Sequence, residues 1–299
     1  MFKITSIGEI LLDVYPDFKR LGGAPFNFIY HIKKLIGKAN FISSVGNDTE
    51  GKELLNILKK NDFNTDTIFI DNDHPTGKVL VTLDENKTPQ FKMSSTSCFD
   101  FLQLTEKAKQ VIDESDLIYF GTFTSRSEVS RKTIQSILNK PNKKYFCDLN
   151  LRHNFYTIDF IEQALISSNV LKINEEEFYK LQNIFGFPAD IENAIQDLIS
   201  KYKIDLIALT MGEVGSKLFT SMDYHFYQQE KIEVVDTLGA GDAFSAILCL
   251  GYLNNFQLEK INLNANHFAA EICKINGAIP ESDKLYLTNS QIFNNILKD

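Results

Sequence analysis

Short apolar runs alternate with amphipathic helical patterns along most of the chain, and this alternation restricts the fold more than any other feature. The short runs predict strands over residues 2–8, 40–45, 117–120, 144–148, 170–173 and 205–209. The helical patterns cover residues 25–36, 51–60, 128–138, 158–168, 175–185 and 191–201. Apolar strands that alternate with helices form a parallel sheet covered on both faces. The pattern therefore predicts an α/β protein with three layers, α/β/α, and a mostly parallel central sheet.

One stretch, residues 74–101, has no helical pattern. Within it, residues 78–83 and 90–94 read as strands joined by the polar segment 84–89, which predicts a β-hairpin. Together with residues 10–21, this hairpin predicts a small antiparallel sheet that projects from the main domain. No low-complexity linker and no repeat of 20–50 residues divides the chain, so we expect a single domain over residues 1–299.

The charge balance excludes several classes of partner. The chain has 31 Lys and Arg against 39 Asp and Glu, a net charge of −8, so non-specific binding to nucleic acid is not expected. The longest strongly apolar stretch, residues 243–253, falls well short of the roughly twenty residues that span a bilayer. Glu9 and Asp13 interrupt an N-terminal segment that does not read as a signal peptide. We therefore expect a cytoplasmic protein that binds small molecules, without nucleic acid or membrane as partner.

The strongest chemical signal is the segment 234–244, in which Gly239 and Gly241 directly precede an apolar helix. Glycines there let the backbone turn tightly and leave its N–H groups unobstructed, and the helix dipole adds to them, so the segment predicts an anion site. Asp242 then lies in the first helical turn, where it could simply cap the helix. Because a carboxylate beside a bound phosphate is costly unless something must lose a proton there, the pattern favours Asp242 as a base.

Polar or glycine-rich turns follow five of the expected strands, and ligands of open α/β sheets bind at the carboxyl ends of strands. Asp13 closes the first strand, and Asn27 begins a helix behind a Gly22-Gly23 turn; both side chains suit hydroxyl groups. Arg152 carries a guanidinium suited to phosphate oxygens. The remaining turns are residues 174–177 and 210–215. We expect these turns to share one site.

Two nucleotide-binding motifs are excluded. Residues 46–53 match a P-loop through Lys52, but Glu53 stands where a Ser or Thr must hold Mg²⁺. No G-x-G-x-x-G is present, because Phe244 occupies the last position of the nearest candidate, so a dinucleotide-dependent dehydrogenase is not expected. The four cysteines form no C-x-x-C pair and the five histidines are scattered, which removes a zinc or redox motif.

With these motifs the chain resembles the ribokinase-like carbohydrate kinases, or PfkB family, and most closely the fructokinase branch. Residues 236–242 (Asp-Thr-Leu-Gly-Ala-Gly-Asp) are similar to the family's C-terminal signature, and Gly22-Gly23-Ala24-Pro25-x-Asn27 is similar to its sugar-binding element. The turn at residues 46–51 also recurs in the family. The resemblance runs from Ile7 to about Pro280 and implies a ribokinase-like sandwich whose small β-sheet acts as a lid.

The resemblance implies transfer of the γ-phosphoryl group of Mg-ATP to a primary hydroxyl of a small sugar, with fructose as the first expectation. It implies that Asp242 is the catalytic base, and that Arg152 reaches toward the transferring phosphate. The implied anion hole is the backbone of Gly239, Ala240 and Gly241. The implied sugar-binding residues are Asp13, Gly23 and Asn27. The implied nucleotide-binding residues are Thr210, Gly212, Gly215 and Asn266.

The resemblance also implies two cation sites and a partner. Asn174 and Glu177 look like the family's N-x-x-E element, which organises Mg²⁺ and phosphate through water. Asp236 and Thr237, with the loop at residues 277–282, correspond to a site for a monovalent cation such as K⁺ in some relatives. Lid strands of the family often pair across a dimer, so a homodimer through the lid is implied.

The acceptor stays open at this point. The lid segment 91–100 is more polar than the fructokinase branch usually shows, and the same motifs suit a kinase for 2-keto-3-deoxygluconate, ribose or a nucleoside. A non-catalytic sugar or nucleotide sensor on the same fold is the other alternative, although a sensor needs no base at position 242. Because the N-terminus of a helix favours negative charge, we expect a lowered pKa for Asp242.

Overall fold

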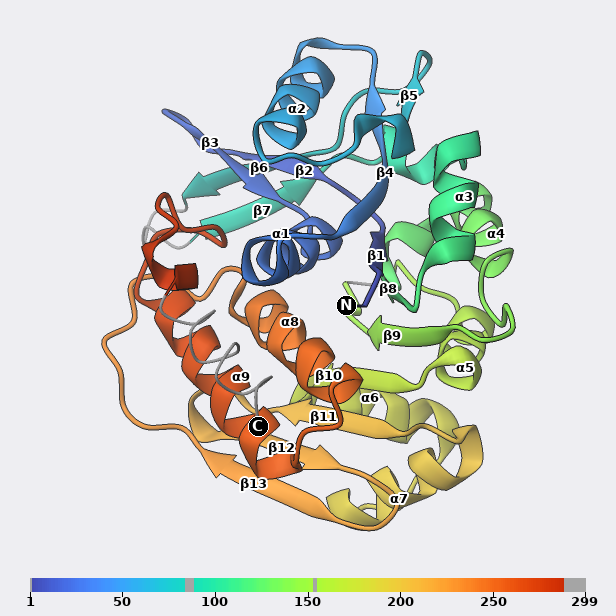
Figure 1. Cartoon of the computed structure of the whole chain (residues 1–299), viewed down its shortest axis with the longest axis vertical. Helices are drawn as coiled ribbons and strands as arrows, with labels where there is room; N and C mark the ends of the chain where they lie inside the picture. Colours follow the sequence, from blue (N-terminus) through green and yellow to red (C-terminus); the bar gives the residue numbers. More distant parts are fainter. Residues whose placement is uncertain (1, 84–88, 153–154, 288–299) are drawn as a thin grey trace.

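The central sheet has nine strands in the order β13-β12-β11-β10-β9-β8-β1-β4-β5 (Figure 1). The computed structural model describes residues 2–83, 89–152 and 155–287. The parallel strands are β1 (Ile4–Ile7), β4 (Asn40–Gly46), β5 (Ile68–Asp71), β8 (Leu117–Gly121), β9 (Lys144–Asp148), β10 (Val170–Asn174) and β11 (Leu206–Thr210). The antiparallel hairpin of β12 (Gly215–Phe219) and β13 (Tyr224–Gln228) forms one edge.

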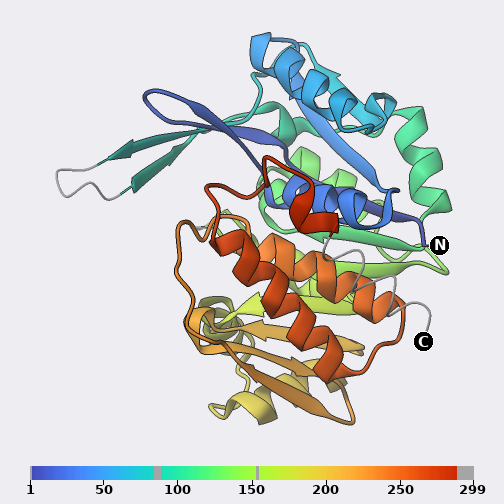
Figure 2. The ribbon, with the colours of Figure 1, turned by 60° about the vertical axis from the view of Figure 1, so that its left-hand side comes forward.

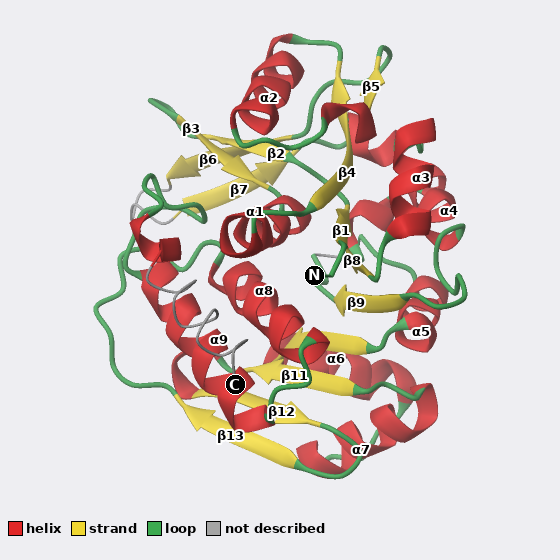
Figure 3. Ribbon diagram, viewed as in Figure 1, coloured by secondary structure: helices red, strands yellow, loops and turns green. Residues whose placement is uncertain are grey.

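Helices cover both faces of this sheet (Figure 3). One apolar core includes residues of α1 (Ala24–Ile36), α2 (Thr49–Lys60), α8 (Ala240–Leu253) and α9 (Leu258–Cys273). The other includes residues of α3 (Glu106–Glu114), α4 (Glu128–Gln135), α5 (Ile158–Ser167), α6 (Glu175–Phe185) and α7 (Ile191–Tyr202). Within β1, Ile4 belongs to the first core and Ile7 to the second, as expected for a strand buried on both faces.

A second sheet of four strands, which we call the lid, projects from the main sheet (Figure 2). Its strands are β2 (Leu11–Val14), β3 (Lys19–Gly22), β6 (Lys78–Leu83) and β7 (Pro89–Met93), in the order β3-β2-β6-β7. The pairs β2–β3 and β6–β7 are antiparallel, whereas β2 and β6 pair in parallel and so join the two hairpins. Leu11 and Val79 pack on Phe99 and Phe123 at the base of the lid.

The turn at residues 46–53 has a structural role. Asp48 is the N-cap of α2, and its carboxylate accepts the N–H of Gly51 at 2.7 Å. The same carboxylate accepts both the hydroxyl and the N–H of Thr76, at 2.6 and 2.8 Å, just before lid strand β6 begins. This carboxylate therefore ties α2 to the base of the lid, in agreement with the rejection of a P-loop here.

The predicted α/β fold and the small separate sheet are confirmed, and several elements were missed. Four short 3-10 helices complete the described elements: η1 (Thr65–Thr67), η2 (Cys98–Phe101), η3 (Phe123–Arg126) and η4 (Gly212–Val214). The sequence reading did not assign β5, α3, α9 or the β12–β13 hairpin. Most of the predicted connection between the lid strands, residues 84–88, lies outside the described residues. Within the described chain, every helix is too short or too polar to cross a membrane.

Candidate active site

The carboxyl ends of four neighbouring parallel strands bring the polar turns together. Gly121 of β8 is in register with Asp148 of β9, and Asp148 is in register with Lys172 of β10. Two residues further on, Asn174 pairs with Thr210 of β11. The turns predicted to share one site at residues 148–152, 174–177 and 210–215 therefore lie along one edge of the sheet.

The N-terminus of α8 has the features of an anion site. Its N-cap residue is Gly239, which adopts the left-handed conformation with φ 77° and offers no side chain to the free N–H groups. A Cβ at Gly239 would lie 2.6 Å from the Cα of Ala278, so the turn also needs glycine for space. Behind the turn, a Cβ at Gly241 would lie 3.1 Å from the Lys172 Nζ. A buried ammonium therefore stands directly behind the backbone that was predicted to bind phosphate.

Asp242 is the third residue of α8, and its carboxylate turns away from the helix backbone. Its Oδ2 accepts the Nδ2 of Asn27 at 2.8 Å, a contact between α8 and α1. No side chain caps α8, so the capping alternative is wrong for Asp242. Burial and, secondarily, the nearby Asp148 carboxylate raise the pKa of Asp242 to about 7, although Asn27, Lys172 and Arg152 act in the opposite direction. The expectation of a lowered pKa is therefore wrong, because desolvation outweighs the helix dipole.

Asn27, which contacts Asp242, and Asp13, in lid strand β2, both have acceptor atoms to spare. Asn27 is only 3% exposed, and its Oδ1 has no hydrogen-bond partner among the described residues. Asp13 is 7% exposed, and within the described chain no hydrogen-bond donor contacts its carboxylate. Burial raises the pKa of Asp13 to about 6, while Arg20 and Arg152 lower it. A buried acceptor without a donor, such as Asn27 Oδ1, is costly, so this position is suited to a ligand that supplies a hydroxyl group.

Asp13 does not lie where the sequence reading put it, whereas Gly23 does open a helix as expected. Asp13 was expected to close the first strand, but it lies within lid strand β2, after the chain has left the central sheet. Gly23 is the N-cap of α1 with φ 108°, and a Cβ there would lie 3.1 Å from the carbonyl carbon of Glu9. Gly23 therefore has a packing role, since it lets α1 begin against the backbone that leads into the lid.

A buried network behind the anion site was missed by sequence reasoning. The Lys172 Nζ lies 3.1 Å from Asp148 Oδ1. Asp148 Oδ2 accepts the hydroxyls of Ser245, at 3.0 Å, and Tyr119, at 3.2 Å. The available signal was a single lysine inside the apolar run 170–173, because a buried Lys needs a partner. This network holds the Lys172 ammonium next to Gly241, in the backbone that was predicted to bind phosphate.

The N-x-x-E element forms a capping box at the start of α6. Asn174 Oδ1 accepts the N–H of Glu177 at 2.8 Å, and Glu177 Oε2 accepts the N–H of Asn174 at 2.9 Å. Glu177 Oε1 accepts the N–H of Leu151 at 2.9 Å, which holds the segment that carries Arg152. The Nε of Arg152 donates to Asn150 Oδ1, and the side chain is otherwise exposed toward the site. Burial raises the pKa of Glu177.

These residues fit an indirect role toward Mg²⁺. In the described part of the chain, no group of three or more His, Cys, Asp or Glu side chains could enclose a metal ion. Each oxygen of the Glu177 carboxylate already accepts one backbone N–H and keeps a second lone pair for water. Mg²⁺ is usually held by substrate phosphates and water with one or two protein carboxylates, and this donor set matches that pattern.

The predicted nucleotide residues lie beside the edge hairpin. Thr210 ends β11, and Gly212 and Gly215 have φ of 55° and 121°, so the turn between β11 and β12 depends on glycine. Asn266 of α9 is buried, and its Nδ2 donates to Ser216 Oγ at 2.7 Å and to the carbonyl of Asn262. The amide nitrogen of Asn266 therefore already joins α9 to β12. The contact of Asn266 with adenine stays a prediction.

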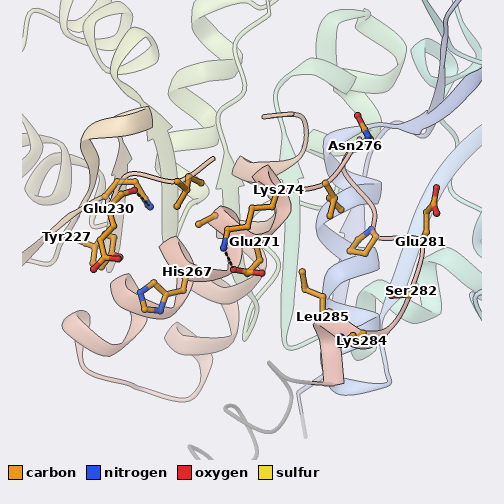
Figure 4. A pocket seen from close by; sticks show the side chains of 15 residues that line it. Tyr227, Glu230, His267, Glu271, Lys274, Asn276, Glu281, Ser282, Lys284 and Leu285 are labelled. Carbon is orange, nitrogen blue, oxygen red and sulfur yellow. Dashed lines mark hydrogen bonds and ion pairs between the residues drawn. The ribbon is translucent and has the colours of Figure 1, made fainter. Parts of the chain in front are cut away.

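A large cavity lies away from Asp242. It has a volume of about 980 Å³ and lies between the end of β13, α9 and the segment after α9 (Figure 4). Tyr227, His267 and Lys274 line it, and none of Asp13, Asn27 or Asp242 does. Tyr227 is the neighbour of Gln228, which pairs with Gly215. The cavity therefore adjoins the predicted nucleotide residues.

The predicted monovalent-cation residues lie in the loop before α8. Asp236 Oδ1 accepts the N–H of Leu238 at 3.0 Å, and its Oδ2 accepts the N–H of Gly277 at 3.0 Å. The Oδ2 also accepts the Nη1 of Arg20, at 3.0 Å, from lid strand β3. Arg20 was not recognised in the sequence. The backbone carbonyl of Thr237 accepts the N–H of Ala240 at 3.3 Å.

Comparisons with known proteins agree with this arrangement. A family model described as pfkB family carbohydrate kinase matches residues 8–285. The chain is 26% identical to the fructokinase of Salmonella typhimurium over 82% of both chains. It is also 26% identical to an ATP-dependent 6-phosphofructokinase of Thermoanaerobacterium thermosaccharolyticum, over 87% of this chain and 84% of that one.

A solved structure extends the likeness to three dimensions. The crystal structure of an uncharacterized sugar kinase from Pyrococcus horikoshii in complex with ATP matches with a TM-score of 0.80 and 27% identity. The match covers 92% of this chain and 93% of that one. Both the motifs and the whole-chain fold agree with the family model, and the chain therefore belongs to the pfkB family of carbohydrate kinases.

Proposed function

We propose that this carbohydrate kinase is an ATP-dependent fructokinase that transfers the γ-phosphoryl group of Mg-ATP to a primary hydroxyl of fructose in the cytoplasm. The observation that carries the proposal is the contact of Asn27 with Asp242 at the N-terminus of α8. It joins a carboxylate with a pKa of about 7, a buried amide oxygen without a partner, and an uncapped helix N-terminus. Transfer to an alcohol needs these parts: a base, a hydroxyl-binding group and an anion site.

The acceptor is held between the lid and α1. Asp13 and Asn27 supply buried acceptor atoms for neighbouring sugar hydroxyls, and Asn27 at the same time orients Asp242. Fructose in its ring form offers a primary hydroxyl next to ring hydroxyls and suits this set. The fructokinase relative supports that choice, while the 6-phosphofructokinase relative makes fructose 6-phosphate the second candidate.

The phosphoryl donor lies across the strand ends. The N-terminus of α8 receives the γ-phosphoryl oxygens. Asn174 and Glu177 would hold Mg²⁺ through water, and the cation would supply charge balance on the phosphates. Arg152 approaches the transferring group from the segment that Glu177 holds. The nucleoside extends past Thr210 and Gly212 toward the cavity that Tyr227 and His267 border.

The reaction is an in-line displacement. The sugar oxygen attacks the γ-phosphorus, the bond from that phosphorus to the β–γ bridging oxygen breaks, and ADP leaves. The hydroxyl proton passes to Asp242 Oδ, whose pKa of about 7 matches neutral pH, where a base is half ionised and still basic. Lys172 and the backbone N–H groups of α8 stay fixed while charge spreads over the phosphoryl oxygens.

The test is ADP production from Mg-ATP with a panel of acceptors: fructose, fructose 6-phosphate, 2-keto-3-deoxygluconate, ribose and a nucleoside. Fructose should give the highest kcat/KM. Asp242→Asn should lower kcat by about 10²- to 10⁴-fold with little change in sugar binding, because the base is lost and the hydrogen bond to Asn27 can be kept.

The matched control is Asp159→Asn, which removes the same charge from the first turn of another helix, at an exposed position of α5. It should keep wild-type kcat. Preference for another acceptor would retain the phosphotransfer but reject fructose. Normal kcat in Asp242→Asn would reject the base, and binding without turnover by the wild type would favour the sensor.

A further inference from the structure

Lid strand β3 contributes a guanidinium to the loop that precedes α8. The Arg20 Nη1 lies 3.0 Å from Asp236 Oδ2, and the two residues are 216 positions apart. The guanidinium carbon of Arg20 also lies 5.2 and 5.0 Å from the ring centres of Tyr15 and Phe18, which stack on each other 4.3 Å apart. These two rings belong to the turn between β2 and β3. Arg20 is therefore held by the lid from one side and by Asp236 from the other.

Both oxygens of the Asp236 carboxylate accept hydrogen bonds, and Oδ2 already has two donors, one of them a guanidinium. Its Oδ1 accepts the N–H of Leu238, and its Oδ2 accepts both Gly277 N–H and Arg20. K⁺ needs oxygen atoms whose lone pairs are free and whose charge is not already balanced. A guanidinium within hydrogen-bond distance of Asp236 balances that charge and repels a second cation nearby. The residues present at Asp236 therefore do not fit the monovalent cation that the family resemblance implied.

The position of Asp236 explains why its charge matters. Its Oδ1 holds the N–H of Leu238, the residue directly before the N-cap Gly239, so the carboxylate shapes the turn that opens the anion site. Left unbalanced, the same carboxylate would repel a phosphate at the N-terminus of α8. A positive partner for Asp236 thus fixes the turn and removes this repulsion.

Arg20 also lies beside the acceptor site. In the antiparallel pair β2–β3, Arg20 is directly opposite Asp13, and its charge lowers the pKa of Asp13 while burial raises it. One side chain therefore contacts the phosphate-binding loop and acts electrostatically on a carboxylate of the acceptor pocket. This arrangement makes closure of the lid and order in the anion site mutually dependent.

We propose that Arg20 is a positioning residue that takes the place of a monovalent cation in this kinase, so that its lid, and not K⁺, holds the 236–239 turn ready for phosphate. The inference rests on the kinase activity but not on the identity of the sugar, and the acceptor with the highest turnover serves for its test. It predicts a K⁺-independent wild type, and a requirement for an external cation only after Arg20 is removed.

The experiment compares wild type, Arg20→Met and Arg20→Lys in KCl and in tetramethylammonium chloride at equal ionic strength. Wild-type kcat should agree within about twofold in the two salts, because no cation site needs filling. Arg20→Met should lose about 10- to 100-fold in kcat, since a turn displaced by an ångström misplaces the phosphate. Added guanidinium ion or K⁺ should restore part of this loss, and Arg20→Lys should lie between the two.

Lys19→Met is the matched control. Lys19 is the neighbouring cation of the lid, but it contacts Glu50 and Glu53 and not Asp236. It should keep wild-type kcat. Thermal unfolding gives a readout without turnover: wild type should have the same Tm in both salts, and Arg20→Met a higher Tm in KCl. Activation of wild type by K⁺ above about fivefold together with a K⁺-specific rise in Tm would overturn the proposal. Wild-type kcat in a folded Arg20→Met would overturn it as well.

Discussion

Asp242 combines two properties that usually exclude each other in a carboxylate at a helix N-terminus. The helix dipole and the Asn27 amide favour its ionised form, yet dense packing and the Asp148 carboxylate raise its pKa to about 7. Glu9 has the same tendency, since burial raises its pKa to about 7 against the hydrogen bond from Thr124. Raised pKa values of buried acids are common at sites of proton transfer, which agrees with the proposed role of Asp242.

The raised pKa of Asp242 predicts how kcat/KM depends on pH. Asp242 accepts a proton only when ionised, so kcat/KM for the sugar should fall about tenfold per pH unit below pH 7 and level off above it. Asn27→Ala removes the amide that lowers this pKa, so the acid limb should move to higher pH. The measurement is the pH profile of kcat/KM.

The control for that profile is Asn193→Ala, an exposed asparagine in α7, which should leave the acid limb unmoved. An acid limb that stays in place in Asn27→Ala would show that another group controls it.

Single residues also mark how far the sequence could be read. Asp242, Asn27 and the glycines of the anion site were predicted from type and spacing, because the chemistry of a helix N-terminus is local. Lys172 and Arg20, and the partners of Asp148, were missed because the contacts join positions distant in sequence: Asp236 is 216 positions from Arg20 and Ser245 is 97 from Asp148. Their importance comes from register and packing, which no short window contains.

At the scale of elements, the turn into α8 depends on glycine for two separate reasons. Gly239 has φ 77°, and a Cβ there would also meet Ala278. Gly37 ends α1 with φ 75°, and a Cβ there would meet nothing within 4 Å. A comparison of Gly37 with Gly239 therefore separates the cost of a left-handed backbone from the cost of steric overlap.

Gly37→Ala should therefore lower the free energy of unfolding by about 1–2 kcal/mol, the cost of a left-handed residue with a Cβ. Gly239→Ala should cost about 1–3 kcal/mol more from the overlap with Ala278 and should also lower kcat. Denaturant unfolding and ADP production measure the two effects. Equal losses of stability, with kcat unchanged in both, would mean that Ala278 yields and that the turn is not critical for phosphate binding.

Element prediction succeeded where periodicity was clear and failed at the sheet's antiparallel edge. The strands buried on both faces gave compact apolar runs, and the predicted hairpin in the lid is present. In β13 only every second residue is partly buried, and Tyr224 and Phe226 are exposed, so its pattern resembles a loop rich in aromatic residues. The parallel pairing of β2 with β6 could not be predicted either, because it depends on which hairpin edges meet.

For the whole molecule, the lid is one of the places with exposed apolar side chains. Leu80 of β6 and Phe18 before β3 are both nearly half exposed, while Val79 faces inward. The family resemblance implies pairing of lids between two copies, and these side chains suit that contact.

We therefore expect a dimer in light scattering, and Leu80→Glu should shift it toward the monomer because a buried charge is costly at an apolar contact. Val129→Glu, a similar change at an exposed apolar residue of α4, should leave the mass unchanged. A monomeric wild type, or a Leu80→Glu that stays dimeric, would reject the lid as the interface.

The fold distributes the site between the two ends of the chain. Asn27 and Asp242 are 215 positions apart, and β1 lies between β4 and β8 in the sheet. During synthesis on the ribosome, the acceptor pocket and its lid therefore emerge long before the segment that binds phosphate. The contact between Asn27 and Asp242 can therefore form only after α8 has been made, so this corner of the molecule is completed late in synthesis relative to α1.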